Sequence, residues 1–173
     1  MKTHWLHLFS VNRPYNFVGV LVGSNFIFVA LASADIEGKA RIVDGDTLVI
    51  NEERIRLHGS DAPEQPQKCL AENIEWGCGV EATEALERMI SKKKVYCVGD
   101  DRDRYKRLIA VCYIGAFNLN RQMVKEGWAL VYRRYSNDYL PEETAARKAK
   151  RGVWRGEFVS PWDWRKKRRS RSK

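Results

Sequence analysis

Residues 56–64 read Arg-Leu-His-Gly-Ser-Asp-Ala-Pro-Glu, and this run follows an Asp-Gly-Asp-Thr segment at residues 44–47. A third charged segment, Asp-Arg-Tyr-Lys-Arg, occupies residues 103–107. Asp-Gly by itself is first of all a turn signal between strands. Together, however, the three segments supply two carboxylates for a hard cation, a third carboxylate that can activate water, and two arginines for a phosphate. Such a set is typical of metal-assisted phosphodiester hydrolysis.

The apolar pattern around these segments predicts short strands mixed with helices. Apolar, β-branched-rich runs predict strands, whereas apolar spacing of three to four residues, caps and terminal charges predict helices. The expected strands are 39–43, 47–50, 54–57, 94–98 and 108–114, and the expected helices are 80–91, one capped by Asn118, and one starting at Pro141. Five or so strands with about three helices define an α+β fold and suit a small Greek-key barrel.

The three charged segments resemble the thermonuclease family, also called staphylococcal-nuclease-like, and the resemblance runs from about Lys39 to Trp154. It implies a five-stranded OB-fold Greek-key barrel that brings the segments to one site, with Ca²⁺ as the cofactor. By this resemblance, Asp46, Asp61 and the carbonyl of Ala62 bind Ca²⁺. Ala62 stands where the family often has Thr.

The resemblance also assigns the remaining chemistry. Glu64 would act as the general base that activates or orients water, and Arg56 and Arg107 would bind the scissile phosphate. Tyr105 and Tyr135 are candidates for stacking on a base or touching a phosphate. The residue before Arg107 is Lys106, where the family has Gly.

Histidine usage excludes other mechanisms. The chain has three histidines, at positions 4, 7 and 58. The first two lie in a predicted signal peptide, so a two-histidine ribonuclease mechanism or a histidine-rich zinc site is excluded for the mature chain. For His58, which is at a strand end, we expect a structural role.

The N-terminal segment predicts export. An apolar run from Phe17 to Ala32 ends in Ala-Ser-Ala at residues 32–34, which is typical of a cleavage site. We therefore expect residues 1–34 to be a signal peptide cleaved after Ala34, which makes the protein periplasmic or secreted. The alternative is an uncleaved segment that anchors the protein to a membrane.

The four cysteines agree with an oxidising compartment. They are Cys69, Cys78, Cys97 and Cys112, all after the expected cleavage site and none in a Cys-x-x-Cys motif. The first two flank a short loop, and the last two fall on strands that a hairpin would place side by side. We therefore expect disulfides 69–78 and 97–112, with four buried free thiols as the alternative.

Charge divides the chain unevenly. The net charge is +9, but residues 35–164 contain as many acidic as basic residues, and seven basic residues lie in 165–173. We expect 35–164 to form one thermonuclease-like domain, and 165–173 to be a disordered basic tail that attracts polyphosphate. The alternative is a solvated terminus that only aids solubility.

The sequence therefore predicts a Ca²⁺-dependent endonuclease that hydrolyses DNA and RNA with little sequence or sugar specificity. We expect single-stranded or frayed substrates to be preferred, and the resemblance implies 3′-phosphate products. We also expect a monomer with no obligate protein partner. The alternative is a non-catalytic OB-fold protein of the cell envelope that binds nucleic acid or another polyanion. Glu64 beside two aspartates favours catalysis, because a binding module has no use for it.

Overall fold

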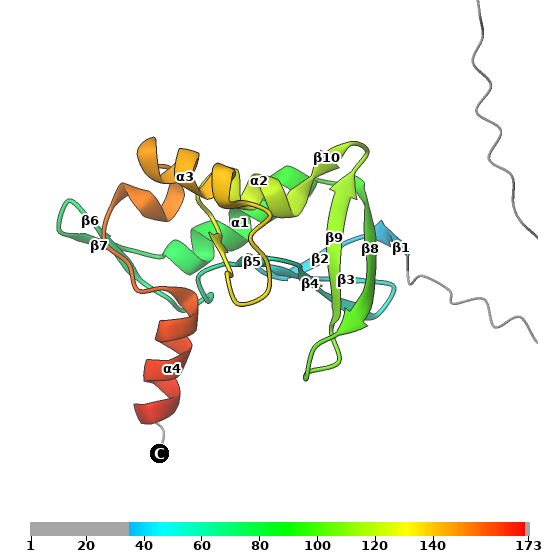
Figure 1. The fold of residues 1–173 in the computed structure, drawn as a ribbon, viewed down its shortest axis with the longest axis horizontal. Helices are drawn as coiled ribbons and strands as arrows, with labels where there is room; N and C mark the ends of the chain where they lie inside the picture. Colours follow the sequence, from blue (N-terminus) through cyan, green and yellow to red (C-terminus); the bar gives the residue numbers. More distant parts are fainter. Residues whose placement is uncertain (1–34, 172–173) are drawn as a thin grey trace, which may run out of the picture. The chain divides into compact units, whose positions relative to one another are not determined.

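The structure is a computed structural model that describes residues 35–171, so the predicted signal peptide lies outside the described residues. Within this part, strands and helices combine in an α+β architecture (Figure 1). In chain order the elements are β1 (Ile36–Lys39), β2 (Arg41–Asp44), β3 (Thr47–Ile50), β4 (Glu53–Leu57), β5 (Ser60–Asp61), β6 (Cys69–Ala71), β7 (Ile74–Trp76), α1 (Cys78–Ile90), β8 (Lys94–Arg102), β9 (Leu108–Ile114), β10 (Phe117–Asn118), α2 (Leu119–Lys125), β11 (Leu130–Val131), α3 (Leu140–Lys148), the 3₁₀ helix η1 (Gly152–Arg155) and α4 (Pro161–Arg171).

The main sheet curls so that its two edges are consecutive pieces of chain. Its strand order is β1-β8-β9-β4-β3-β2, with β10 added to β9. β4 and β9 run parallel and the other neighbours run antiparallel. Only Ala40 separates β1 from β2, so these two edges behave as one bent strand. Counted in this way, β1–β2, β3, β4, β8 and β9 make five strands, which confirms the α+β class and the OB-like barrel.

The curl of this sheet is visible in Figure 1, where β8 and β9 stand almost across the direction of β2, β3 and β4. Two strand pairs that the sequence did not predict extend the fold: the β6–β7 hairpin and the short antiparallel pairing of β5 with β11. The described residues contain four α-helices, where about three were expected, and the additional one is α4.

Helix α1 covers the barrel with the apolar face that its sequence predicted. Ala82, Leu86 and Ile90 are all buried, and they pack in one core with Leu48 and Ile55 from β3 and β4. Burial of a side chain such as Leu86 stabilises the fold by roughly 1.5–3 kcal/mol. Helix α2 begins where expected, because the Asn118 side chain accepts a hydrogen bond from the Arg121 N–H.

Two glycines of the charged segments, Gly45 and Gly59, occupy positions where the backbone geometry favours glycine. A side chain at Gly45 would place its Cβ 2.8 Å from the Cβ of Ala62, so this glycine lets the β2–β3 turn approach the segment after β5. Gly59 has a φ of +73°, a left-handed conformation that favours glycine. His58 contributes backbone groups: its N–H donates to the carbonyl of Ala110 at 2.8 Å. The close approach of Gly45 to Ala62 brings residues 44–47 next to residues 56–64, and the His58 bond ties residues 56–64 to β9.

Both predicted disulfides are confirmed. Cys97 and Cys112 are directly opposite each other on β8 and β9, with Cα atoms 4.1 Å apart. Cys69 and Cys78 join the start of β6 to the start of α1, with Cα atoms 5.7 Å apart. No cysteine in the chain is left free.

The C-terminal segment differs from its expectation. The sequence predicted disorder from Arg165, but Pro161–Arg171 form helix α4. The Ser160 hydroxyl accepts from the Asp163 N–H at 3.4 Å and donates to the Asp163 carboxylate at 2.6 Å, which caps the first turn. Trp162 stacks on Tyr132, with ring centroids 5.4 Å apart. The predicted boundary between domain and tail at 164/165 therefore falls inside a helix.

No helix among residues 35–171 combines the length and the apolar character needed to span a bilayer.

Candidate active site

Two buried aspartates from separate elements form the centre of the site. Asp46 lies in the β2–β3 turn, directly before β3, and is 2% exposed, whereas Asp61 ends β5 and is fully buried. The Asp46 carboxylate accepts hydrogen bonds from the Thr47 hydroxyl at 3.2 Å and from the Ala62 N–H at 2.7 Å. Burial raises the pKa of Asp46 well above its ordinary value, although the charge of Arg56 opposes this effect. This carboxylate therefore lies where more positive charge would be favourable.

Arg56 joins the two aspartates. Its position on β4 is directly opposite Thr47 on β3. One terminal nitrogen donates to Asp46, and the other donates to Asp61 at 2.5 Å and to the Ser60 carbonyl at 3.3 Å. Burial lowers the pKa of Arg56, but the two carboxylates raise it by more, so the net pKa is raised. Arg56 is therefore a permanent cation between the aspartates.

Arg107 reaches the same group through Thr47. Its Nη1 donates to the Thr47 hydroxyl at 3.1 Å, and this hydroxyl donates in turn to Asp46. Asp103 holds the other side of the guanidinium, since it accepts from Nε at 2.7 Å. Between them, Lys106 has a φ of +65°, a left-handed conformation that explains why a glycine is expected there. The loop thus holds Arg107 in position despite the lysine.

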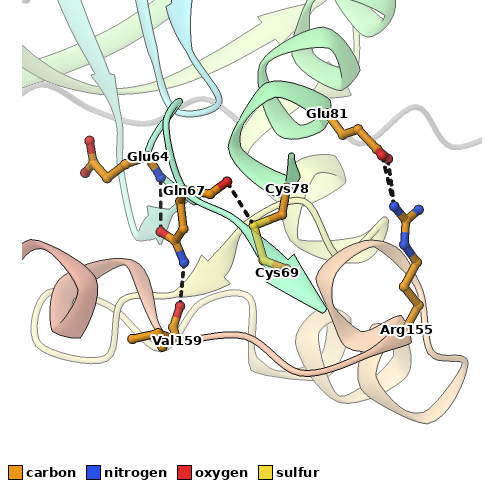
Figure 2. The surroundings of a disulfide bond; sticks show 7 residues. All are labelled: Glu64, Gln67, Cys69, Cys78, Glu81, Arg155 and Val159. Atoms are coloured by element: carbon orange, nitrogen blue, oxygen red, sulfur yellow. Dashed lines mark hydrogen bonds and ion pairs between the residues drawn. A yellow bond between two sulfur atoms is a disulfide. The ribbon is translucent and has the colours of Figure 1, made fainter. Parts of the chain in front are cut away.

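Glu64 is presented by a loop that Gln67 holds in place (Figure 2). The fully buried Gln67 side chain accepts from the Glu64 N–H at 3.3 Å and donates to the Val159 carbonyl at 2.6 Å. Nearby, the Cys69–Cys78 disulfide secures the segment that follows. In Figure 2 the Glu64 carboxylate points away from the disulfide and from Gln67. Its side chain is 31% exposed and is thus accessible to water.

Arg165, from α4, completes the group. One terminal nitrogen donates to Glu64 at 2.7 Å and to Asp61 at 3.0 Å, and the other donates to the second oxygen of Asp61 at 2.6 Å. Burial lowers the pKa of Arg165, but the hydrogen bonds and charge of Asp61 and then of Glu64 raise it by more, so the net pKa is raised. The sequence placed this arginine in a tail with no part in the site.

The structure brings the predicted chemical residues into one connected network. Thr47 links Arg107 to the aspartates, and Arg165 links Glu64 to them. The predicted residues joined in this way are Asp46, Arg56, Asp61, Glu64 and Arg107. Ala62 lies beside them through its N–H, and the ligand role expected of its carbonyl stays a prediction.

The two tyrosines lie at the periphery of this network. Tyr105 is 64% exposed, and its ring lies under the guanidinium groups of Arg104 and Arg107, at 4.8 and 5.6 Å from the ring centroid. Tyr135 is 62% exposed and packs edge-on against Tyr132. Tyr105 therefore adjoins Arg107, whereas no contact joins Tyr135 to the carboxylates. Their roles in binding stay predictions.

Sequence reasoning assigned no role to four residues of the site: Thr47, Gln67, Asp103 and Arg165. Thr47 and Asp103 lie inside the quoted segments. Asp103 is four positions before Arg107, and this spacing of opposite charges was available as a signal for their ion pair. Gln67 and Arg165 act across distances of 92 and 101 residues, to Val159 and Glu64. No local pattern reveals such contacts.

The residues present fit a hard divalent cation in their chemistry. Asp46, Asp61 and Glu64 supply carboxylate oxygens, which are ligands that Ca²⁺ takes. Three carboxylates outweigh the single charge of Arg56, so the group favours an added cation. In this structure Arg165 supplies that charge, and no cluster of three His, Cys, Asp or Glu side chains within residues 35–171 is arranged to hold a metal ion.

This barrel, with a carboxylate and arginine centre at the ends of its strands, defines the thermonuclease class of fold. A family model described as "Staphylococcal nuclease homologue" matches residues 54–156, more than half of the chain. The chain belongs to this family. It is 36% identical over 141 residues to a protein of Escherichia coli O157:H7 named "Uncharacterized endonuclease", which covers 76% of this chain and 86% of that protein.

Other relatives carry different names. A protein of Rhizobium meliloti named "Succinoglycan biosynthesis protein ExoI" is 34% identical over 131 residues, covering 73% of this chain and 68% of that protein. The "Probable staphylococcal-like nuclease CAN1" of Oryza sativa is 33% identical over 131 residues, covering 73% of this chain and 36% of the rice protein. The matched region therefore makes up about two thirds of the Rhizobium protein but only about a third of the rice protein.

Proposed function

We propose that this protein is a nuclease that hydrolyses phosphodiester bonds of DNA and RNA with the aid of Ca²⁺. The observation that carries the proposal is the single network of Asp46, Arg56, Asp61, Glu64 and Arg107. The family and the names of several relatives support it. A protein that only bound a polyanion would gain nothing from three carboxylates beside the arginines, because they would repel phosphate.

The two arginines are suited to hold the substrate. Guanidinium groups bind phosphate oxygens bidentately and keep their charge at any working pH. Arg107 is anchored by Asp103 and Thr47, so its remaining donors are oriented before the substrate arrives. Each such donor directed at developing charge contributes about 10²–10³ in rate.

Glu64 is suited to proton transfer from water. Its carboxylate is partly exposed, while Asp46 and Asp61 are buried and hydrogen-bonded on several sides. Asp46, Asp61 and the Ala62 carbonyl would hold Ca²⁺, which supplies positive charge beside the phosphate when bound. Glu64 then takes the proton of the attacking water. Cleavage that leaves 3′-phosphates is the outcome that the family resemblance implies.

Tyr105 fits a substrate-binding role. Its exposed ring adjoins Arg107, where a base or sugar next to the bound phosphate would lie. Stacking on an aromatic ring is tolerant of sequence, and it favours unpaired bases. We therefore propose little sequence specificity and a preference for single-stranded or frayed ends. Tyr135 would contact the substrate further from the carboxylates.

The direct test is the degradation of single-stranded DNA and RNA with Ca²⁺ and then with chelator. Glu64→Gln and Arg107→Ala should each lower kcat by at least about 10², whereas Asp46→Asn should mainly raise the Ca²⁺ concentration needed for activity. Glu75→Gln is a matched control, since Glu75 is an exposed glutamate on β7. Turnover equal to wild type in both the Glu64 and the Arg107 variants would refute the catalytic assignment.

We also propose export, with cleavage after Ala34. The two disulfides support this proposal, because such bonds persist in oxidising compartments. N-terminal sequencing of the protein from its native host should find Asp35 first. A retained Met1 would favour the anchored alternative.

A further inference from the structure

We propose that α4 is a built-in inhibitor of this site: Arg165 competes with the divalent cation for Asp61 and Glu64, and a polyanion bound along the rest of α4 releases it. The proposal rests on the proposed function and adds a regulation to it. Its basis is the salt bridge from Arg165 to both carboxylates, at 2.6 Å to Asp61 and 2.7 Å to Glu64.

The contact removes the groups that a cation and a water need. Asp61 has both oxygens engaged, one by Arg56 and Arg165 and the other by Arg165. A divalent cation at Asp61 would therefore meet two guanidinium groups at close range and be repelled. Glu64 is also affected, because one of its carboxylate oxygens is occupied by the hydrogen bond from Arg165 at 2.7 Å.

Charge balance gives the same result. Asp46, Asp61 and Glu64 carry three negative charges, and Arg56 offsets one of them. The remaining excess suits one divalent ion. With Arg165 docked, the negative excess is smaller by one charge, so the site attracts a divalent ion less strongly. Arg165 therefore acts as a substitute for part of the cation's charge.

The first turn of α4, which positions Arg165, is held against the barrel by several contacts. Trp162 stacks on Tyr132, and Gln67 ties Val159, just before the helix, to the loop that carries Glu64. Pro161 is buried, while the side chains beyond Arg165 are exposed. The first turn thus holds the helix on the barrel, and the later turns extend into solvent.

The exposed later turns of α4 carry the basic residues that would bind a polyanion and so release Arg165 from the carboxylates. Lys166, Lys167, Arg168, Arg169 and Arg171 follow Arg165 without an acidic residue between them. A long polyphosphate chain neutralises such a row and releases counterions. Its phosphates also offer Arg165 an alternative partner, so binding of the substrate favours the undocked helix. A short substrate cannot reach the row and leaves the helix docked.

The first test compares Ca²⁺ affinity by calorimetry in the full chain without substrate. If Arg165 is docked in nine of ten molecules, it weakens Ca²⁺ binding about tenfold, so Arg165→Gln should bind Ca²⁺ about tenfold more tightly than wild type. Arg121→Gln is the matched control, because Arg121 is an exposed arginine on α2 that pairs with Glu142. Far-UV circular dichroism checks that each variant is folded. Equal or weaker Ca²⁺ binding by Arg165→Gln would overturn the proposal.

The kinetic test uses a dinucleotide-sized substrate at limiting Ca²⁺. Arg165→Gln should cleave it several-fold faster than wild type, and the two should converge at saturating Ca²⁺. A lower kcat at saturating Ca²⁺ would instead make Arg165 a positioning residue for Glu64 and would overturn the inhibitor role. If wild type and variant both leave DNA intact at saturating Ca²⁺, the proposed nuclease function fails, while the calorimetric comparison still decides the competition.

The release step has its own measurement. Hydrogen exchange of the α4 amides is followed in chelator, with and without a nuclease-resistant phosphorothioate oligonucleotide. We expect the oligonucleotide to lower the protection of α4 in wild type. Protection that rises or stays constant would show that the helix remains docked with a polyanion bound, and would overturn the release.

Discussion

Thr47→Val removes one hydroxyl from the centre of the site and keeps the shape of the side chain. Thr47 is fully buried, and its hydroxyl accepts from Arg107 at 3.1 Å and donates to Asp46 at 3.2 Å. It therefore links Arg107, which we propose binds the phosphate, to the buried carboxylates. Valine is β-branched like threonine, so the strand β3 should keep its conformation.

The magnitude follows from what remains after the substitution. Arg107 keeps its bonds to Asp103, and Asp46 keeps Arg56 and the Ala62 N–H, so neither charge is left without a partner. The substitution removes two hydrogen bonds to charged groups, one with Arg107 and one with Asp46. The bond at Arg107 is the one that bears on the bound phosphate, and its loss costs about 1.5–3 kcal/mol at most. Part of this is recovered from water, so we expect about 1.4 kcal/mol of transition-state stabilisation to be lost, which is a tenfold fall in kcat/KM.

The assay is the initial rate on single-stranded DNA at saturating Ca²⁺, with the thermal unfolding of each variant as a check on stability. Thr83→Val is the matched control, because the Thr83 hydroxyl is also buried and hydrogen-bonded but donates to the Gly79 carbonyl within α1. Thr47→Val should lose more stability than Thr83→Val, because its hydroxyl bonds two charged groups, and only Thr47→Val should lose rate. Equal kcat/KM in the two variants would refute the role of Thr47 as the link to Arg107.

Three further changes test the surroundings of the site. Asp103→Asn should lower kcat/KM about tenfold, which corresponds to about 1.4 kcal/mol of activation free energy, because Arg107 loses the carboxylate that holds it. Steady-state kinetics on the same DNA would measure this fall. Burial raises the pKa of Asp103, but the hydrogen bonds from Arg107 lower it by more, so the net pKa is lowered. The ionised Asp103 therefore stabilises the fold above its ordinary pKa, and this stabilisation disappears as the pH falls through the lowered pKa. When unfolding is followed during acid titration, the Asp103→Asn variant should lose less stability than wild type. Replacing Cys97 and Cys112 together by Ala should cost about 3 kcal/mol in denaturant unfolding, from the loop that this bond closes. Lys106→Gly should change stability by less than about 1 kcal/mol, because relief of the left-handed backbone is offset by the flexibility of glycine in the unfolded chain, and unfolding curves that differ by more would contradict this balance.

The barrel was largely predictable because its strands follow local rules. The runs at 47–50 and 108–114 are apolar and β-branched, and both lie in the main sheet. The short hairpin β6–β7 was missed because Cys69–Ala71 and Ile74–Trp76 are only three residues each, too short to establish an alternation of apolar and polar side chains. The pairing of β4 with β9 also has no local signal, since it joins strands that are more than fifty residues apart.

The site could be predicted where its reactive and charged residues lie together in short segments of sequence. Asp46, Asp61 and Glu64 lie in short segments of recognisable sequence, and in the structure Arg56 links Asp46 to Asp61 while Arg165 links Asp61 to Glu64. Residues that only hold these groups in place were not predictable. Gln67, for example, has its partners at Glu64 and Val159, and a buried glutamine has no sequence pattern of its own.

Helix α4 shows why charge density alone misjudges a segment. Six basic residues among Arg165–Arg171 disfavour an isolated helix, since like charges repel along it. Tertiary contacts reverse the outcome, because Asp61, 104 residues earlier, and Glu64 provide the negative charge that the segment itself lacks. The docking of α4 and the binding of a cation to Asp61 and Glu64 are therefore coupled in one equilibrium. By linkage, a cation that displaces Arg165 must loosen α4 by the same factor by which the docked α4 weakens the cation.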